Sequence, residues 1–319
     1  MSNPRHLLLW TDRPAPYVAA IAEAGVAERV AVEAVARKET PSAAQLDTTE
    51  VLLAPAVPPG LLARMPRLRW VQAMTAGVEG WLALPDLPRG MTLTCARGTH
   101  RESMPENILG ALFYVAKPYA ASVEDQKQRR WTHRVAAPLN GKTLGILGLG
   151  AVGQEVARLA AGLGMRVIGT RRRGALLPGL AEVLPPERTD EVLGQSDFVL
   201  LLLPATAGTE SFMDARRLAQ MKSDAWLLNF GRGHLIADAD LISAVQSKRI
   251  AGAVLDVFRQ EPLPAEHPFW TTEGIIVLPH IGGPHPQRDQ IVARLFVENL
   301  RCFLDGRPLK EVVDRDAGY

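Results

Sequence analysis

The stretch 143-TLGILGLGAVG-153 constrains the fold more than any other part of the chain, because an apolar run passes directly into regularly spaced glycines. Gly148, Gly150 and Gly153 have the spacing G-x-G-x-x-G. In a strand–turn–helix unit, the first glycine allows a tight turn, the second lets a pyrophosphate approach the backbone, and the third lets the helix pack closely on the strand. A second apolar run, 166-RVIGT, supplies the next strand. We therefore predict dinucleotide binding in preference to an ordinary structural turn.

The residues after this turn have the spacing of a helix. Val152, Val156, Leu159 and Leu163 recur at intervals of four, three and four residues, which is typical of one helical face. The N–H groups at the start of such a helix have no partner within it and can bind an anion. Ala151 and Val152 are therefore assigned to the cofactor site together with the glycines.

The end of the second strand indicates which dinucleotide is bound. An NAD-preferring site carries an acidic residue about 20 residues beyond the glycine motif, for the ribose 2′-hydroxyl. This chain has Thr170, Arg171, Arg172 and Arg173 there and no acid. Because a guanidinium pairs well with a phosphate, we predict NADP(H), with NAD(H) as the alternative. A solvated basic turn explains Arg173 equally well.

Short apolar runs recur along the whole chain and predict buried strands. They are 7-LLLW, 51-VLLAP, 69-RWVQAM, 92-TLTCA, 143-TLGILG, 166-RVIGT, 198-FVLLLL, 225-AWLLNF, 252-GAVLDV and 275-IIVLP. The later runs are continuously apolar, as expected of parallel strands that are covered on both faces. Helical patterns lie between several of them. We predict an α/β fold with two Rossmann-like, doubly wound parallel-sheet domains and a cleft between them.

The domain boundaries are predicted from two helical stretches. One runs from Ser103 to about Trp131 and would link the domains. The other begins after Pro284 and Pro286 and would return to the first domain. Its apolar positions are Ile291, Leu295, Val297, Leu300 and Leu304. The predicted domains are a discontinuous substrate domain, residues 1–102 plus 286–319, and a dinucleotide-binding domain, residues 103–285.

Composition excludes several classes of function. The formal net charge is +2, from 36 basic and 34 acidic residues, so nothing indicates a nucleic-acid or membrane-surface partner. Two distant cysteines imply no disulfide framework, and the histidines lack ligand spacing, so no metal is assigned. No signal peptide or membrane-spanning run is evident, and a cytoplasmic location is expected.

Three ionisable residues follow successive late strands, where an open α/β sheet binds its ligands. They are Arg232, Glu261 and His280. An arginine can hold a carboxylate and polarise a carbonyl, while an imidazolium can donate a proton to a developing alkoxide. A nearby glutamate would keep that imidazole protonated and oriented. Together the three residues predict reduction of a 2-oxo acid.

Each of these residues also has a structural explanation. His280 could be a structural histidine, Glu261 a surface carboxylate, and Arg232 the partner of Asp238. Taken singly, the structural explanation is preferred for Glu261 and equal for the other two. Their combination behind a dinucleotide fold favours catalysis.

Five segments, in this order, carry a resemblance to a known family. They are 148-GLGAVG, 203-LPATAGT, 229-NFGRG, 255-LDVFRQEPLP and 279-PHIGG. Over essentially its whole length the chain resembles the D-isomer-specific 2-hydroxyacid dehydrogenases, and within them the NADPH-linked glyoxylate/hydroxypyruvate reductases. The resemblance implies that Arg232 binds the substrate and that Glu261 and His280 form the acid/base pair.

The resemblance implies further site residues and an assembly. Cofactor contacts would fall to Pro204, Thr209 and Asp256, and a homodimer is expected. In 74-MTAGVEG, backbone N–H groups would bind the substrate carboxylate. These residues are Ala76, Gly77 and Val78. From the residues alone, an ordinary glycine turn is the better-supported interpretation of that segment.

The sequence thus predicts an NADPH-dependent reduction of glyoxylate, hydroxypyruvate or another small 2-oxo acid to the D-2-hydroxy acid. Two positions depart from the family pattern, Gly231 in place of an alanine and Leu278 in place of a threonine, and both can reshape the pocket. One alternative is a nucleotide-sensing binding protein on the same fold. The other is a dehydrogenase of a different small anion.

Overall fold

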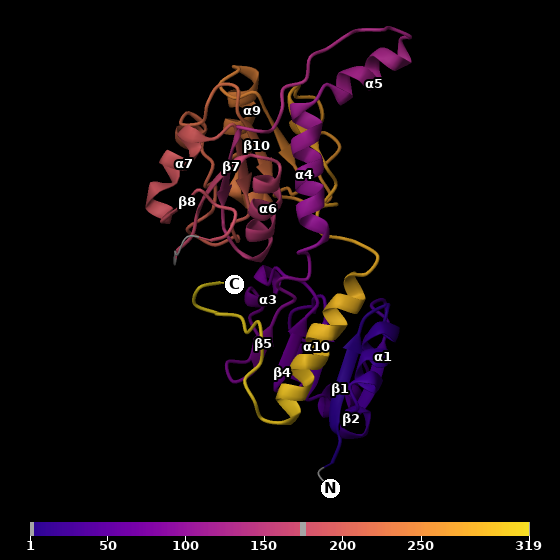
Figure 1. The fold of residues 1–319 in the computed structure, drawn as a ribbon. Coiled ribbons are helices and arrows are strands. Elements are labelled where there is room, and N and C mark those ends of the chain that lie inside the picture. Colours follow the sequence, from indigo (N-terminus) through magenta and orange to yellow (C-terminus); the bar gives the residue numbers. More distant parts are fainter. Residues whose placement is uncertain (1–2, 173–176, 319) are drawn as a thin grey trace. The chain divides into compact units, whose positions relative to one another are not determined.

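The structure is a computed structural model that describes residues 3–172 and 177–318, and the chain divides into two compact units (Figure 1). Unit 1 consists of Met1–Thr99 and His285–Tyr319, and unit 2 of His100–Pro284. Both ends of the chain therefore contribute to unit 1.

Unit 1 contains a five-stranded sheet in the order β2-β1-β3-β4-β5, and all neighbouring strands are parallel. This is one of the two common orders of doubly wound sheets. The strands are β1 (Arg5–Trp10), β2 (Val30–Val35), β3 (Val51–Ala54), β4 (Trp70–Ala73) and β5 (Thr92–Thr94). The helices are α1 (Ala15–Glu23), α2 (Ala43–Thr48), α3 (Glu79–Leu82) and α10 (Arg288–Leu304).

Alternate residues of these strands pack on opposite faces of the sheet, as strand geometry requires. Leu7 and Leu9 belong to a core shared with α1 and α10, whereas Leu8 belongs to the core on the other face. Phe296 of α10 stacks on Trp70 of β4, with ring centroids 5.3 Å apart. In Figure 1, α10 lies beside α1. The last long helix therefore completes the domain that the first strands begin.

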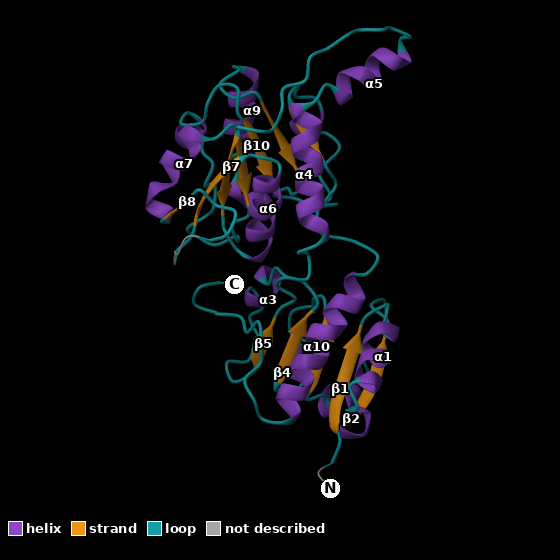
Figure 2. Cartoon of the chain, viewed as in Figure 1, coloured by secondary structure: helices purple, strands orange, loops and turns teal. Residues whose placement is uncertain are grey.

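Unit 2 contains a seven-stranded sheet in the order β12-β11-β10-β9-β6-β7-β8, again with all neighbours parallel. The strands are β6 (Thr143–Leu147), β7 (Arg166–Thr170), β8 (Glu182–Leu184), β9 (Phe198–Leu201), β10 (Trp226–Asn229), β11 (Gly252–Leu255) and β12 (Ile275–Val277). The helices are α4 (Ser103–Ala116), α5 (Tyr119–Lys127), α6 (Ala151–Gly162), α7 (Thr189–Gln195), α8 (Ala215–Leu218) and α9 (Asp238–Gln246). Figure 2 shows the strands between helices.

The order of this sheet reverses next to β6, because the chain moves outward to β7 and β8 and then returns to β9 on the other side. Such a reversal is the switch point of a doubly wound sheet. Leu144 and Ile146 of β6 pack in a core with residues of α4 and α6. The sequence-based prediction of two doubly wound parallel-sheet domains is confirmed for the sheets themselves. Among the helices of the described residues, none is both long and apolar enough to cross a membrane.

The ten strands predicted from apolar runs are all present, but β2 and β8 were missed. Both strands lie at an edge of their sheet. β2 buries only its first and last residues, and β8 is three residues long. Glu33 interrupts β2, and β8 is short and begins with Glu182, so neither strand shows the continuous apolar run on which the prediction relied.

The helical stretch predicted from Ser103 to about Trp131 begins at Ser103 as expected, but it consists of two separate helices, α4 and α5, and ends at Lys127. The break falls at Lys117, which has an extended backbone with φ −117° and ψ 150° and precedes Pro118. The ring of a proline clashes with a helical conformation of the residue before it.

The apolar face predicted for the last helix is partly wrong. Val297 and Leu300 are buried as expected, but Ile291, Leu295 and Leu304 are only half-buried. The other buried residues of this helix are Asp289, Val292, Ala293, Phe296 and Asn299. The face is thus centred on Phe296, and two of its members are polar, which an apolar pattern does not reveal.

Candidate active site

The candidate residues of unit 2 follow strands that are all parallel, so these residues lie on the side of the sheet formed by the carboxyl ends of the strands. The loops after β6, β9, β10, β11 and β12 carry, in that order, the glycine turn, Thr209, Arg232, Glu261 and His280. Ligands of doubly wound sheets bind at the carboxyl ends of the strands, beside the switch point. The fold therefore gathers these loops where a dinucleotide and its reaction partner would bind.

The glycine turn has the geometry that its spacing predicts. Gly148 has φ +107°, and a Cβ added there would lie 2.7 Å from the carbonyl oxygen of Leu202. A Cβ on Gly153 would lie 2.6 Å from the carbonyl oxygen of Gly148, so the start of α6 packs closely on β6. Gly150, the N-cap of α6, would meet nothing within 4 Å. These features fit a pyrophosphate placed against the backbone and the helix N-terminus.

Ala151 and Val152 form the first turn of α6 and are half-buried. Thr170 ends β7, is buried, and accepts a hydrogen bond from Leu149 N–H at 3.2 Å. The adjacent Arg171 is half-buried, and its N–H donates to the edge strand β8 at 3.0 Å. Arg172 is exposed, and Arg173 lies outside the described residues. The strand end is therefore fixed by backbone bonds.

The loop after β9 is closed by one threonine side chain. The hydroxyl of Thr209 donates to the carbonyl oxygen of Pro204 at 2.7 Å and accepts from Thr206 N–H at 2.8 Å. Thr209 and Pro204, both predicted to contact the cofactor, are therefore brought together at the switch point.

Arg232 follows β10 and is half-buried, and its loop is held by Asn229, the last residue of that strand. The fully buried Asn229 side chain donates to the carbonyl oxygen of Arg232 at 2.9 Å and accepts from Gly231 N–H at 3.1 Å. Sequence analysis did not assign Asn229 a role. The available signal was a polar residue at the end of a fully apolar strand, where a buried amide needs partners.

Glu261 and His280 are in direct polar contact. Glu261 Oε2 lies 2.6 Å from His280 Nδ1, and Glu261 Oε1 accepts from Phe258 N–H at 2.9 Å. The carboxylate is thus fixed by its own loop and orients the ring through Nδ1. The imidazole side chain is 50 % exposed, so Nε2 is the ring nitrogen left for a reaction partner. This arrangement suits proton transfer at Nε2.

The backbone at His280 has a conformation that few non-glycine residues adopt. Its φ is +52°, and its N–H donates to the carbonyl oxygen of Leu278 at 2.9 Å. Just beyond it, Asp256 accepts from Ile281 N–H at 2.8 Å and from Gly282 N–H at 3.0 Å. Such conformations persist when surrounding contacts impose them, and they cluster at functional sites.

Asp256 is therefore an internal support of the histidine loop. It is fully buried at the end of β11, and burial raises the pKa of its carboxyl group. A Cβ on Gly282 would lie 2.6 Å from Asp256 Oδ2, so only glycine fits against this carboxylate. The predicted cofactor contact of Asp256 stays a prediction.

Asp238, considered from sequence as a partner of Arg232, lies beside Arg259 and His267. Its carboxylate is 3.5 Å from Arg259 Nε and 3.5 Å from His267 Nε2. Burial raises the pKa of the Asp238 carboxyl group, although both neighbours oppose that effect. Arg259 is a second residue to which sequence analysis gave no role.

The segment predicted to bind the substrate carboxylate belongs to unit 1. It follows β4, and Val78 is the N-cap of the short helix α3. Thr75 Oγ1 donates to the carbonyl oxygen of Gly77 at 2.6 Å, and Ala96 N–H donates to the Thr75 carbonyl at 2.9 Å. The turn formed by Ala76–Val78 is thus held from both sides, and its role in binding stays a prediction.

A glycine turn at a switch point, with a cation and a carboxylate–imidazole pair at neighbouring strand ends, defines a dinucleotide-dependent oxidoreductase. Residues 109–282 match the family model described as the NAD binding domain of D-isomer specific 2-hydroxyacid dehydrogenases. The chain belongs to this family of NAD(P)-dependent enzymes. The predictions of the family, of an enzyme and of dinucleotide binding are confirmed.

Relatives along nearly the whole chain support the same assignment. A solved D-isomer specific 2-hydroxyacid dehydrogenase family protein from Aeromonas salmonicida is 33 % identical, with a TM-score of 0.89 over 98 % of this chain and 100 % of that one. The NADPH-dependent glyoxylate/hydroxypyruvate reductase of Sinorhizobium meliloti, solved with NADP and sulfate, is 28 % identical, with a TM-score of 0.87 over 98 % and 99 % of the two chains. Glyoxylate/hydroxypyruvate reductase B of Citrobacter koseri is 31 % identical over 80 % of each chain.

Proposed function

We propose that this enzyme uses NADPH to reduce a small 2-oxo acid, glyoxylate or hydroxypyruvate first, to the D-2-hydroxy acid. The observation that carries the proposal is the 2.6 Å contact between Glu261 Oε2 and His280 Nδ1, at a strand end next to the Arg232 loop. Relatives with printed names of glyoxylate/hydroxypyruvate reductases support the substrate class.

Each candidate residue has a separate role in this reaction. The Arg232 guanidinium binds the substrate carboxylate and polarises the 2-oxo carbonyl. His280 donates a proton from Nε2 to the carbonyl oxygen as negative charge develops there, and Glu261 holds the ring through Nδ1. When bound, the nicotinamide supplies the hydride that adds to the carbonyl carbon. Backbone N–H groups of residues 76–78 are proposed as a second contact to the carboxylate.

The glycine turn and the start of α6 would hold the pyrophosphate, and the end of β7 would choose between the two dinucleotides. Arg171 and Arg172 follow β7, where an NAD-preferring site has a carboxylate. Their guanidinium groups would contact the 2′-phosphate of NADPH. A relative of this chain was solved with NADP, which supports the same choice.

A spectrophotometric assay tests both substrate and cofactor. NADPH and NADH oxidation would be followed against glyoxylate, hydroxypyruvate, pyruvate and a bulky 2-oxo acid. We expect turnover of a small 2-oxo acid with NADPH preferred. Arg171→Ala should raise the KM for NADPH by roughly 10- to 100-fold through loss of a charged hydrogen bond, and leave the KM for NADH unchanged.

The matched control for this variant is Arg166→Ala at the opposite end of β7, where Arg166 pairs with Glu182. It should leave both KM values unchanged. An unaltered KM for NADPH in Arg171→Ala would refute the cofactor assignment. NADPH binding without turnover of any 2-oxo acid would refute the reductase and favour the nucleotide-sensing protein or another anion.

We also infer that the enzyme is a homodimer formed through the segment after α4. In Figure 1 this segment and α5 project from the rest of unit 2. Residues 131–138 are all exposed, and the side chains include Trp131, 98 % exposed, and Val135, 89 % exposed. Large apolar side chains in such a segment are typical of a protein–protein contact.

Light scattering tests this assembly. We expect the native enzyme to have twice the 34.7 kDa mass of one chain. The double variant Trp131→Asp, Val135→Asp should be monomeric, because two buried carboxylates oppose the contact. Exposed Arg158→Asp on α6 serves as the control for added negative charge. A monomeric native enzyme would refute the inference.

A further inference from the structure

The loops that carry Arg232 and Glu261 are in direct backbone contact. The first continues into a short 3-10 helix, η4 (Gly233–Leu235), and the second leaves β11. A Cβ added to Gly233 would lie 1.9 Å from the carbonyl carbon of Phe258 and 2.3 Å from the backbone nitrogen of Arg259. The contact of Gly233 with the Phe258–Arg259 peptide therefore sets the separation of the two loops. Gly233 is one residue after Arg232, and Arg259 is two residues before Glu261.

The side chain of Arg259 joins the same two loops a second time. Its Nε donates to the carbonyl oxygen of Ile236 at 3.0 Å, and its Nη2 donates to the carbonyl oxygens of Ile236 and His234. These carbonyls belong to residues two and four positions after Arg232 in the chain. A guanidinium has donors in a rigid planar fork, so several bonds in one plane fix both position and angle.

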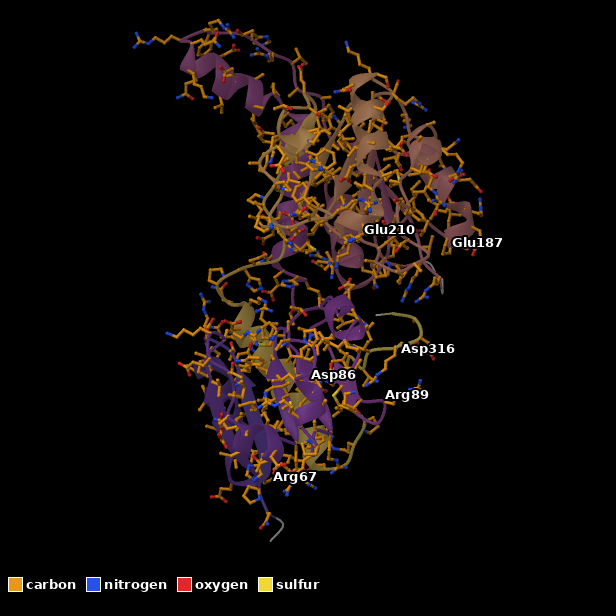
Figure 3. All side chains as sticks on the ribbon, turned by 180° about the vertical axis from the view of Figure 1, so that it is seen from behind. Arg67, Asp86, Arg89, Glu187, Glu210 and Asp316 are labelled. Carbon is orange, nitrogen blue, oxygen red and sulfur yellow. The ribbon has the colours of Figure 1, made fainter. Side chains whose placement is uncertain are left out.

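The guanidinium also reaches a third segment, the loop after β9. Nη2 donates to Ser211 Oγ at 2.8 Å, and Nη1 bonds to Glu210, which is labelled in Figure 3. Asp238, 3.5 Å from Nε, adds a second carboxylate. An exposed ion pair contributes little to stability, and the Glu210 side chain is 48 % exposed. The bonds to the carbonyls and to Ser211 therefore make the larger contribution.

Arg259 is linked to the acid/base pair through the backbone of Phe258, the residue before it. The Phe258 N–H, adjacent to Arg259, donates to Glu261 Oε1 at 2.9 Å, and Glu261 Oε2 holds His280. A shift of this turn would therefore move the carboxylate and the imidazole together. Arg232, on the other loop, would not move with them.

We propose that Arg259 is a positioning residue that ties the loop of Glu261 to the loop of Arg232 and so sets the proton donor against the substrate anchor. Arg259 touches neither substrate nor cofactor in this role. The proposal rests on the proposed function. Because reacting groups must be aligned closely, a displacement of about 1 Å lowers turnover by up to about 100-fold.

The test compares Arg259→Ala and Arg259→Lys with Arg216→Ala, which removes an exposed arginine paired to Asp190 at 2.6 Å in the same unit. We expect kcat for 2-oxo acid reduction to fall by up to about 100-fold in Arg259→Ala, with the dissociation constant of NADPH unchanged. Added guanidinium ion should restore part of kcat. Arg259→Lys keeps the positive charge but loses the planar set of donors, so its kcat should lie between those of the native enzyme and Arg259→Ala.

A second measurement needs no substrate. Hydrogen–deuterium exchange of residues 233–237 and 256–261 should be faster in Arg259→Ala than in the native enzyme or in Arg216→Ala, because the tie between the loops is lost. Unchanged exchange together with native kcat in Arg259→Ala would overturn the proposal. So would a native kcat in Arg259→Lys. If the native enzyme reduces no 2-oxo acid, the proposed function fails, whereas the exchange measurement still tests the tie.

Discussion

His280→Asn is expected to lower kcat for 2-oxo acid reduction by about 10²- to 10⁴-fold, the contribution of a positioned general acid. Asparagine suits the site because it tolerates a left-handed backbone, and His280 has φ +52°. Its amide nitrogen can take the place of Nδ1 opposite Glu261, which lies 2.6 Å from that atom. The substitution therefore removes the Nε2 proton and keeps the loop.

Single-turnover and steady-state rates with NADPH and glyoxylate or hydroxypyruvate check this result. NADPH binding, measured by fluorescence, should be unchanged. Arg216→Ala is the control, because the exposed Arg216 pairs with Asp190 and has no role in the candidate site. A kcat within about threefold of the native value would mean that another group donates the proton, since that is well below the usual contribution of an acid.

The parts of the fold that sequence predicts are those with local signals. Continuous apolar runs predict central strands because burial on both faces leaves no place for polar side chains. β2 and β8 each contain a glutamate and lack that signal. The break between α4 and α5 had a local signal in Pro118, which restricts Lys117, but the helical patterns on both sides of it were read as one stretch.

The residues of the candidate site also differ in whether they have a local sequence signal. Arg232, Glu261 and His280 could be predicted because each follows a strand at a position where chemistry is expected. Arg259 could not, because its partners include backbone carbonyls brought close by folding. Nothing in a linear pattern identifies such partners. A polar side chain at the end of an apolar strand is the one available signal, and it applies to Asn229 and Asp256.

The role of Gly233 is also one that only folding reveals. Its substitution should lower both the stability and the activity of the enzyme. In Gly233→Ala the new Cβ would lie 1.9 Å from the carbonyl carbon and 2.2 Å from the carbonyl oxygen of Phe258. Both are backbone atoms, so no side chain can rotate away and the two loops must separate. Overpacking of this kind costs about 1–3 kcal/mol or more, which lowers the melting temperature by about 3 to 10 °C.

The activity of Gly233→Ala should fall by about 100-fold in kcat/KM, because Arg232 and Glu261 lie on the loops that separate. Gly162→Ala is the matched control. Gly162 ends α6, and a Cβ there would meet nothing within 4 Å, so stability should be unchanged or slightly raised. Calorimetry and the reductase assay would be run on both variants. If Gly233→Ala behaved like Gly162→Ala in both measurements, the contact between the loops would not set the geometry of the site, and the role inferred for Arg259 would lose its basis as well.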